Sequence, residues 1–146
     1  MNAFSTPVLA GGVGALTTTL LHELLRRLTP DAPRIDLLGM QAVERLLHVA
    51  GLRTPAHDTL YTLTVLGDLV SNTAYFGVVG VGPRDKALIV GGALGALAGV
   101  GAVYLPPHLR LSHRPTERTR LTGTFTIALY TGGGLAAGLT YQTLPL

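Results

Sequence analysis

The sequence predicts an all-α membrane protein with four transmembrane helices in a bundle and one amphipathic interfacial helix between the first and second spans. Only 13% of the residues are charged, whereas a soluble domain has about 25%. The mean hydropathy is positive. The 19 glycines interleave with Leu, Val and Ala, a mixture that is typical of membrane helices. We therefore expect residues 1–146 to form a single polytopic membrane domain.

Four stretches of the chain are almost free of charge. Three of them contain no Asp, Glu, Lys or Arg, and the fourth contains only Asp68; they cover residues 1–22, 59–82, 87–109 and 121–146. A bilayer core of about 30 Å needs roughly 20 helical residues, so each stretch is long enough to cross it. The predicted spans lie near residues 5–26, 59–81, 87–105 and 121–142. The alternative is a soluble bundle, but residues 87–105 lack the polar stripe that its outer face would need.

The basic residues predict the orientation of these spans. The first and third connections together carry nine of them, Arg26, Arg27, Arg34, Arg45, Arg53, Arg110, Arg114, Arg118 and Arg120, and the second carries Arg84 and Lys86. By the positive-inside rule the first and third connections face the cytoplasm and both termini lie outside. The first apolar stretch ends in two arginines instead of a small-residue cleavage site, so we expect it to be a retained helix. The expected location is the cytoplasmic (inner) membrane.

Residues 35–50 of the first connection are predicted to form the interfacial helix. At 100° per residue its apolar side chains gather in one arc and its polar side chains in another; the first set is Ile35, Met40, Val43, Leu46, Leu47 and Ala50, and the second is Gln41, Glu44, Arg45 and His48. Such a helix lies at the membrane surface, with its arginines near anionic headgroups. A buried re-entrant segment is the alternative. The wider stretch "LTPDAPRIDLLGMQAVERLL" has the look of a defined signature, but its residues indicate no function by themselves.

Glycines repeat at spacings of four in the third and fourth spans. They are Gly91, Gly95 and Gly99 in the third span and Gly134 and Gly138 in the fourth. Small residues at this spacing let membrane helices approach closely, so we expect them at helix contacts; a glycine-lined pore is the alternative. Short echoes, "GGVGAL" with "GGALGAL" and "TLTV" with "TFTI", suggest two tandem hairpins in the same orientation.

Asp68 lies near the middle of the second span. Side chains on its side of the helix are polar, and they are Tyr61, Thr64, Ser71, Asn72 and Tyr75. A charged Asp at mid-membrane costs on the order of 3 kcal/mol on insertion scales, so something must offset this cost. With Thr126 and Tyr130 of the fourth span, Asp68, Asn72, Thr64, Ser71 and Tyr75 are the predicted lining of a substrate or ion pathway. The alternative is that Asp68 is protonated, or bonded to Asn72 and Thr hydroxyls, as an interhelical clasp that fixes packing.

Three hypotheses of function follow. The first is a transporter or channel component centred on Asp68 and Asn72, working as a homo-oligomer because four short spans enclose little volume. The second is a membrane enzyme that acts on a lipid or isoprenoid through His22, Glu23, Glu44 and His48 at the cytoplasmic interface. The third is a structural or accessory subunit. The first is preferred, so enzymatic activity is not expected.

The expected partners are membrane lipids, including anionic headgroups, and further copies of the chain. The basic third connection, from His108 to Arg120, lacks the interleaved aromatic residues of a nucleic-acid surface, so no nucleic-acid partner is expected. The sequence contains no Cys, which excludes a disulfide framework and a thiolate metal site. No cofactor is expected. A metal site is not expected either, and the four interfacial His and Glu residues are the remaining candidates for one.

Overall fold

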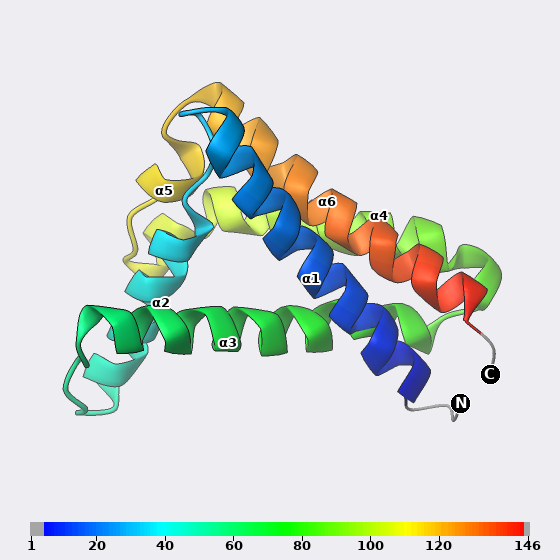
Figure 1. The fold of residues 1–146 in the computed structure, drawn as a ribbon, viewed down its shortest axis with the longest axis horizontal. Helices are drawn as coiled ribbons and strands as arrows, with labels where there is room; N and C mark the ends of the chain where they lie inside the picture. Colours follow the sequence, from blue (N-terminus) through cyan, green and yellow to red (C-terminus); the bar gives the residue numbers. More distant parts are fainter. Residues whose placement is uncertain (1–4, 145–146) are drawn as a thin grey trace.

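The computed structural model describes residues 5–144, which are helical and contain no strand (Figure 1). The longer helices are α1 (Ser5–Leu28), α2 (Ile35–Val49), α3 (His57–Gly77), α4 (Ala87–Tyr104) and α6 (Arg120–Thr143). Shorter elements are the 3-10 helices η1 (Val78–Val81), η2 (Arg84–Lys86) and η3 (Pro106–Leu109) and the one-turn helix α5 (Arg114–Glu117). The predicted all-α fold is confirmed, and each longer helix begins and ends within a few residues of a predicted helical segment.

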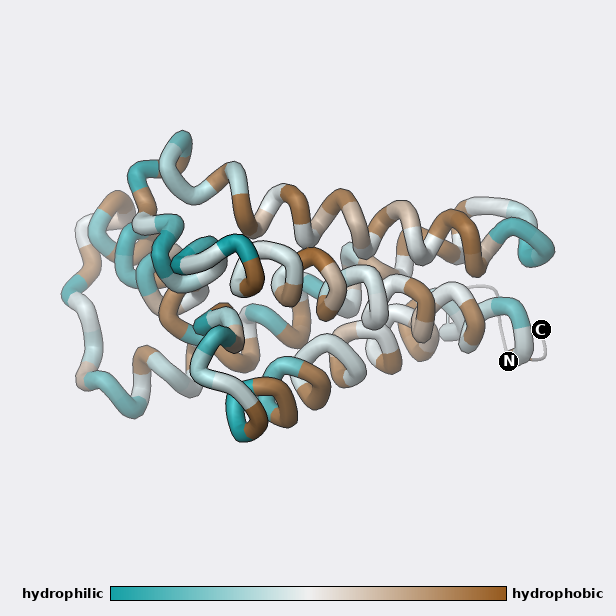
Figure 2. Tube along the Cα trace, turned by 90° about the horizontal axis from the view of Figure 1, so that it is seen from above, coloured by the Kyte–Doolittle hydropathy of each residue, from teal (hydrophilic) through white to brown (hydrophobic). Residues whose placement is uncertain are grey.

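Four of these helices run between two ends of the molecule. Helix α1 begins and α6 ends at one end, which we call the terminal end, and the α1–α3 and α4–α6 connections gather at the other, the loop end (Figures 1 and 2). Helix α2 lies across the loop end (Figure 1). Helices α4 and α6 share the most extensive contact, and α1 packs against both α3 and α6. The loop end also carries most of the hydrophilic residues (Figure 2).

Glycines bring α4 and α6 into backbone contact. A methyl group on Gly91 would lie 2.2 Å from the carbonyl oxygen of Gly134, and one on Gly95 would lie 2.3 Å from that of Tyr130. Distances this short leave no room for any side chain, so these positions require glycine. The expected close packing is confirmed, and these glycines do not line a pore.

Helices α1 and α3 meet near the terminal end and diverge toward the loop end (Figure 1). A methyl group on Gly11 would lie 2.1 Å from the Thr73 carbonyl oxygen, so the two helices touch there. One turn later, Gly14 faces α6 instead, where its methyl group would lie 2.8 Å from the Gly133 carbonyl oxygen. The face of α1 that carries small residues contacts first α3 and then α6. The α1–α3 pair therefore opens into a wedge, whereas the α4–α6 pair stays closed. The two hairpins that the sequence similarity suggests therefore do not pack in the same way.

Many large apolar side chains lie on the surface, and several polar side chains are buried. On α3, Thr64 and Asn72 are only 4% and 9% exposed, whereas Leu66 and Val70 are 55% and 70% exposed. Across the described residues the buried polar side chains are mostly threonines, and the exposed ones include many Leu and Val. An apolar surface of this extent is unusual for a monomeric soluble protein.

Two described helical stretches are long and apolar enough to cross a membrane, Ser5–Leu28 and Arg84–Tyr104. In each, only 28% of the apolar window is buried, whereas the core helix of a soluble protein would be mostly buried. Helices α3 and α6 do not qualify, because Asp68 and frequent Thr, Gly and Tyr residues lower their hydropathy. The prediction of four spans is thus supported only for these two.

Candidate functional site

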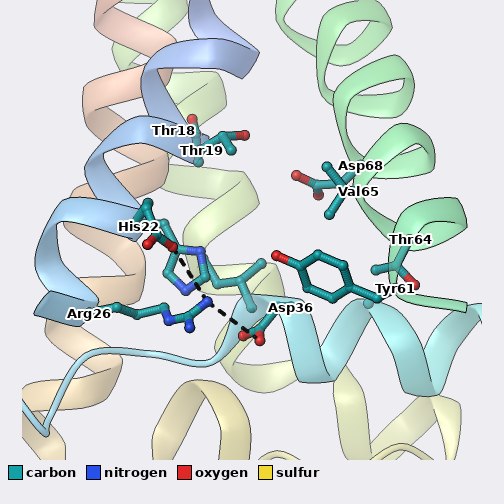
Figure 3. Close-up of a pocket in the computed structure, with 12 residues that line it drawn as sticks. Thr18, Thr19, His22, Arg26, Asp36, Tyr61, Thr64, Val65 and Asp68 are labelled. Carbon is teal, nitrogen blue, oxygen red and sulfur yellow. Dashed lines mark ion pairs between the residues drawn. The ribbon is translucent and has the colours of Figure 1, made fainter. Parts of the chain in front are cut away.

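The Asp68 side chain borders two cavities at the loop end. The first lies in the wedge between α1 and α3 above α2 and has a volume of about 100 Å³; we call it the wedge cavity (Figure 3). The second lies between α2, α3, α6 and the end of α4 and has a volume of about 260 Å³; we call it the α4-side cavity. Ile35 and Gly39 of α2 also border both cavities. Asp68 therefore lies where the two cavities approach each other.

The carboxylate of Asp68 has a single hydrogen-bond partner within residues 5–144. Asn72 Nδ2 donates to Asp68 Oδ1 at 2.9 Å, and no described Lys or Arg forms an ion pair with this carboxylate. Both residues belong to α3, one turn apart, so this bond does not join two helices. The clasp alternative requires a hydrogen bond from Asp68 to another helix, and none of the described hydrogen bonds of Asp68 reaches one.

The hydroxyl groups of the predicted pathway bond mainly to backbone carbonyls. Thr64 donates to Leu60 at 2.8 Å, and Thr126 donates to Thr122 at 2.9 Å and to Thr116 at 3.0 Å. Such bonds satisfy the hydroxyl protons within the protein. Thr64 lines the wedge cavity, but Thr126 lies along neither of the two cavities that Asp68 borders.

The other predicted pathway residues are dispersed. Ser71 is exposed and donates to the backbone oxygen of Asp68 at 3.1 Å. Tyr75 donates to the Leu94 carbonyl oxygen at 2.8 Å, which ties α3 to α4. Tyr130 is buried and borders the α4-side cavity together with Asp68. Asp68, Asn72, Thr64 and Tyr130 thus form the assembled part of the predicted set.

Sequence reasoning did not assign Asp36 to the site, although it lines the wedge cavity. Arg34 Nη2 lies 2.8 Å from its Oδ2 atom. Arg26 Nη1 lies 3.7 Å from the same atom (Figure 3). Burial raises the pKa of this carboxyl, but the hydrogen bond from Arg34 and the charges of Arg34, Arg26 and His22 outweigh burial and hold the pKa below its usual range. The sequence feature that could have indicated this residue is the "PRID" stretch, which leads into α2.

Tyr61 and His22 complete the walls of the wedge cavity. Tyr61 extends from α3 toward α1, between the levels of Asp68 and Asp36 (Figure 3). His22 Nε2 lies 2.7 Å from the Pro33 carbonyl oxygen, so this nitrogen carries a proton, because a carbonyl only accepts. The contact holds the start of α2 beside α1.

The structure does not bring the four interfacial candidates together. His22 and Glu23 line the wedge cavity, whereas Glu44 and His48 line a separate surface cavity with Arg45 and Arg110. The separation arises because α2 crosses the loop end and carries its last turns away from α1. Within the described chain no three His, Cys, Asp or Glu residues cluster closely enough to hold a metal ion. The four candidate residues therefore do not form a joint metal site in the described structure.

No family model matches this chain, and no significant similarity to curated proteins or to solved structures was found. The chemistry of the site accordingly follows from its geometry. A partly buried carboxylate with one amide donor and no basic partner can hold a proton or bind a monovalent cation. Such a ligand can approach Asp68 from either of the two cavities that this residue borders.

Proposed function

We propose that the protein is an integral membrane protein in which α1, α3, α4 and α6 all cross the bilayer. The exposed apolar side chains of α3 support this, since Leu63, Leu66 and Val70 are exposed whereas Thr64 and Asn72 are buried. Asp68 faces a cavity, where an acid within a membrane helix is tolerated. The lower hydropathy of α3 and α6 then reflects the threonines and other polar side chains that these helices bury, not a soluble environment.

The loop end faces the cytoplasm in this proposal, and the terminal end faces outside. Nine of the eleven basic residues lie in the two connections at the loop end or in the helix turns that adjoin them, as the positive-inside rule requires. Helix α2 lies across this end (Figure 1), and Leu46 and Val49 are exposed. These side chains enter the interfacial layer while the arginines meet anionic headgroups. Membrane lipids are therefore the proposed partners of this face, in the cytoplasmic membrane.

We propose transport of a cation, as a transporter or channel component, as the activity. One observation carries this proposal: the Asp68 carboxylate borders two cavities and has no basic partner among the described residues. Buried charges that only stabilise a fold are normally paired. An unpaired carboxylate beside a cavity is instead suited to exchange a proton or a cation.

A second copy of the chain is proposed to complete the route. The lining of the two cavities reaches Thr18, Asp68 and Tyr130 but no residue nearer the terminal end. The contact of Gly11 with the α3 backbone closes the wedge on that side. A homo-oligomer, or a movement of α1 against α3, must therefore provide passage to the outside.

The test compares flux by the parent with flux by Asp68→Asn and Asp68→Leu. Proteoliposomes that contain each protein are assayed for proton, Na⁺, K⁺ and organic-cation flux, and thermal stability is measured in detergent. Asn preserves the shape of Asp but removes its charge, so Asp68→Asn should fold and lose flux. Parent-like flux from Asp68→Asn contradicts the assigned role, and a parent that moves no cation favours an accessory subunit.

The enzyme alternative has weaker support. Its four residues lie in two separate cavities. His22 contacts the Pro33 carbonyl oxygen at 2.7 Å, and Glu23 pairs with Arg27 at 3.1 Å. Groups that are engaged in this way are poorly placed to act as acid, base or metal ligand, so transport is the preferred proposal.

A further inference from the structure

The charge balance of the wedge cavity indicates the sign of the ligand. Three carboxylates line it, but two of them already have basic partners. Glu23 pairs with Arg26 at 3.5 Å and with Arg27 at 3.1 Å. Asp36 pairs with Arg34 at 2.8 Å and with Arg26 at 3.7 Å. Asp68 alone among these carboxylates lacks a cation, so its position favours a positively charged ligand.

The number of ligating groups argues against a divalent metal ion. Ca²⁺ takes six to eight oxygen ligands and Zn²⁺ three or four protein ligands. The described residues contain no three His, Cys, Asp or Glu side chains that lie close enough together to hold a metal ion. One carboxylate can instead neutralise one positive charge, so the ligand is monovalent.

The α4-side cavity indicates that the ligand also has an apolar part. It is lined by Leu38, Ala42, Leu105, Leu109, Leu111 and Tyr130, and Asp68 is the only charged residue on its wall. Such walls cannot replace the hydration shell of an inorganic ion. They can cover hydrocarbon, and Tyr130, which borders the cavity with Asp68, is an aromatic residue of the type that can bind a cation.

We propose that Asp68 binds a monovalent organic cation of the alkylammonium class, with the charged head at the carboxylate and the hydrocarbon chain in the α4-side cavity. This proposal rests on the proposed transport function and names its substrate class. The occupant of the apolar cavity is part of the ligand that Asp68 holds, because the same carboxylate borders both cavities.

The test uses alkyltrimethylammonium ions, from tetramethylammonium to the octyl compound, and the protein in lipid nanodiscs. Saturable binding is measured calorimetrically after subtraction of the signal from empty nanodiscs. Affinity should rise about fourfold with each added methylene until the cavity is filled. Asp68→Asn should weaken binding of every member at least tenfold.

Two variants examine the cavity itself. Ala42→Phe should flatten the dependence on chain length, because the added ring occupies the apolar cavity; the octyl compound should lose much more affinity than tetramethylammonium. Leu38→Ala should shift the optimum to a longer chain, and it keeps the test valid if the larger residue impairs folding. Ala74→Phe is the matched control, since Ala74 is exposed on α3 and borders neither of these two cavities; its binding should equal that of the parent.

Several results would overturn the proposal. They are equal affinity across the series, unchanged binding by Asp68→Asn, and displacement of the organic cation by millimolar Ca²⁺. Asp68-dependent proton or Na⁺ flux without organic-cation binding would reject this substrate class and leave the transport function standing. Absence of flux for every cation, including the alkylammonium ions, would reject the transport function itself.

Discussion

Asn72 Nδ2 donates a hydrogen bond of 2.9 Å to Oδ1 of Asp68, one turn earlier on the same helix. The bond orients the carboxylate without linking α3 to another helix. A hydrogen bond to a charged group contributes roughly 1.5–3 kcal/mol. Here the bond stabilises the charged form of the Asp68 side chain. Asn72 is therefore a positioning residue for the proposed ligand.

Asn72→Ala should weaken cation binding about tenfold or more and leave the helices assembled. The carboxylate loses its described hydrogen bond, while α3 keeps its packing. Binding affinity and helical content by circular dichroism measure the two effects. Ser71→Ala is the matched control, because this exposed hydroxyl bonds only the backbone of Asp68. Equal loss of binding in both variants would show that the Asn72 amide has no special role.

Gly91→Ala should destabilise the α4–α6 pair. The new methyl group would lie 2.2 Å from the Gly134 carbonyl oxygen, and a backbone atom cannot move aside as a side chain can. Overpacking typically costs about 1–3 kcal/mol, which should appear as a lower melting temperature in detergent. Gly12→Ala is the control, since its methyl group would meet nothing within 4 Å. Similar melting temperatures for the two variants would contradict the contact.

Asp36→Asn should reduce the acid sensitivity of the protein. The pKa of Asp36 is lowered in the folded state: burial opposes this change, but the Arg34 hydrogen bond and nearby positive charges outweigh it. A carboxyl with a lowered pKa stabilises the fold above its ordinary value of 3.8, and this contribution is lost as the pH falls through the lower folded value. Because Arg34 is half exposed, the effect should be about 1 kcal/mol.

Melting temperatures of the parent and of Asp36→Asn are compared between pH 6 and pH 3. The parent should be the more stable at pH 6, and the difference should shrink below pH 4. Asp58→Asn is the control, because that carboxylate is fully exposed. A constant difference across this range would exclude the ion pairs of Asp36 as its source.

Cysteines introduced at Asp85 and Ser112 should react with a membrane-impermeant maleimide from opposite sides of the membrane. The chain has no Cys, so each variant carries a single thiol. Asp85 lies in η2 at the terminal end, and Ser112 lies in the exposed connection between η3 and α5 at the loop end. Labelling is measured in intact spheroplasts and in inverted vesicles. Reaction of both positions from one side would refute the proposed topology.

The sequence by itself determined where the helices begin and end. Charge-free stretches and helical periodicity are local properties, so they located α1, α3, α4 and α6 within a few residues. The same periodicity placed Asp68 with Thr64 and Asn72 on the inward face of α3, because positions on one helix have fixed angular relations. The glycine spacings of α4 and α6 likewise indicated a close contact, which the structure shows to be between these two helices.

Only the tertiary structure decided which faces meet. The turn of α1 from α3 at Gly11 to α6 at Gly14 opens the wedge, and no local pattern records which neighbour a small residue will touch. The path of α2 across the loop end brings Asp36 to Arg26 and separates His22 from His48. It also turns Ile35, Leu38, Gly39 and Ala42 toward the cavities, which differs from the apolar arc that periodicity predicts. These relations depend on the directions of whole helices, which are set by contacts between residues far apart in the sequence.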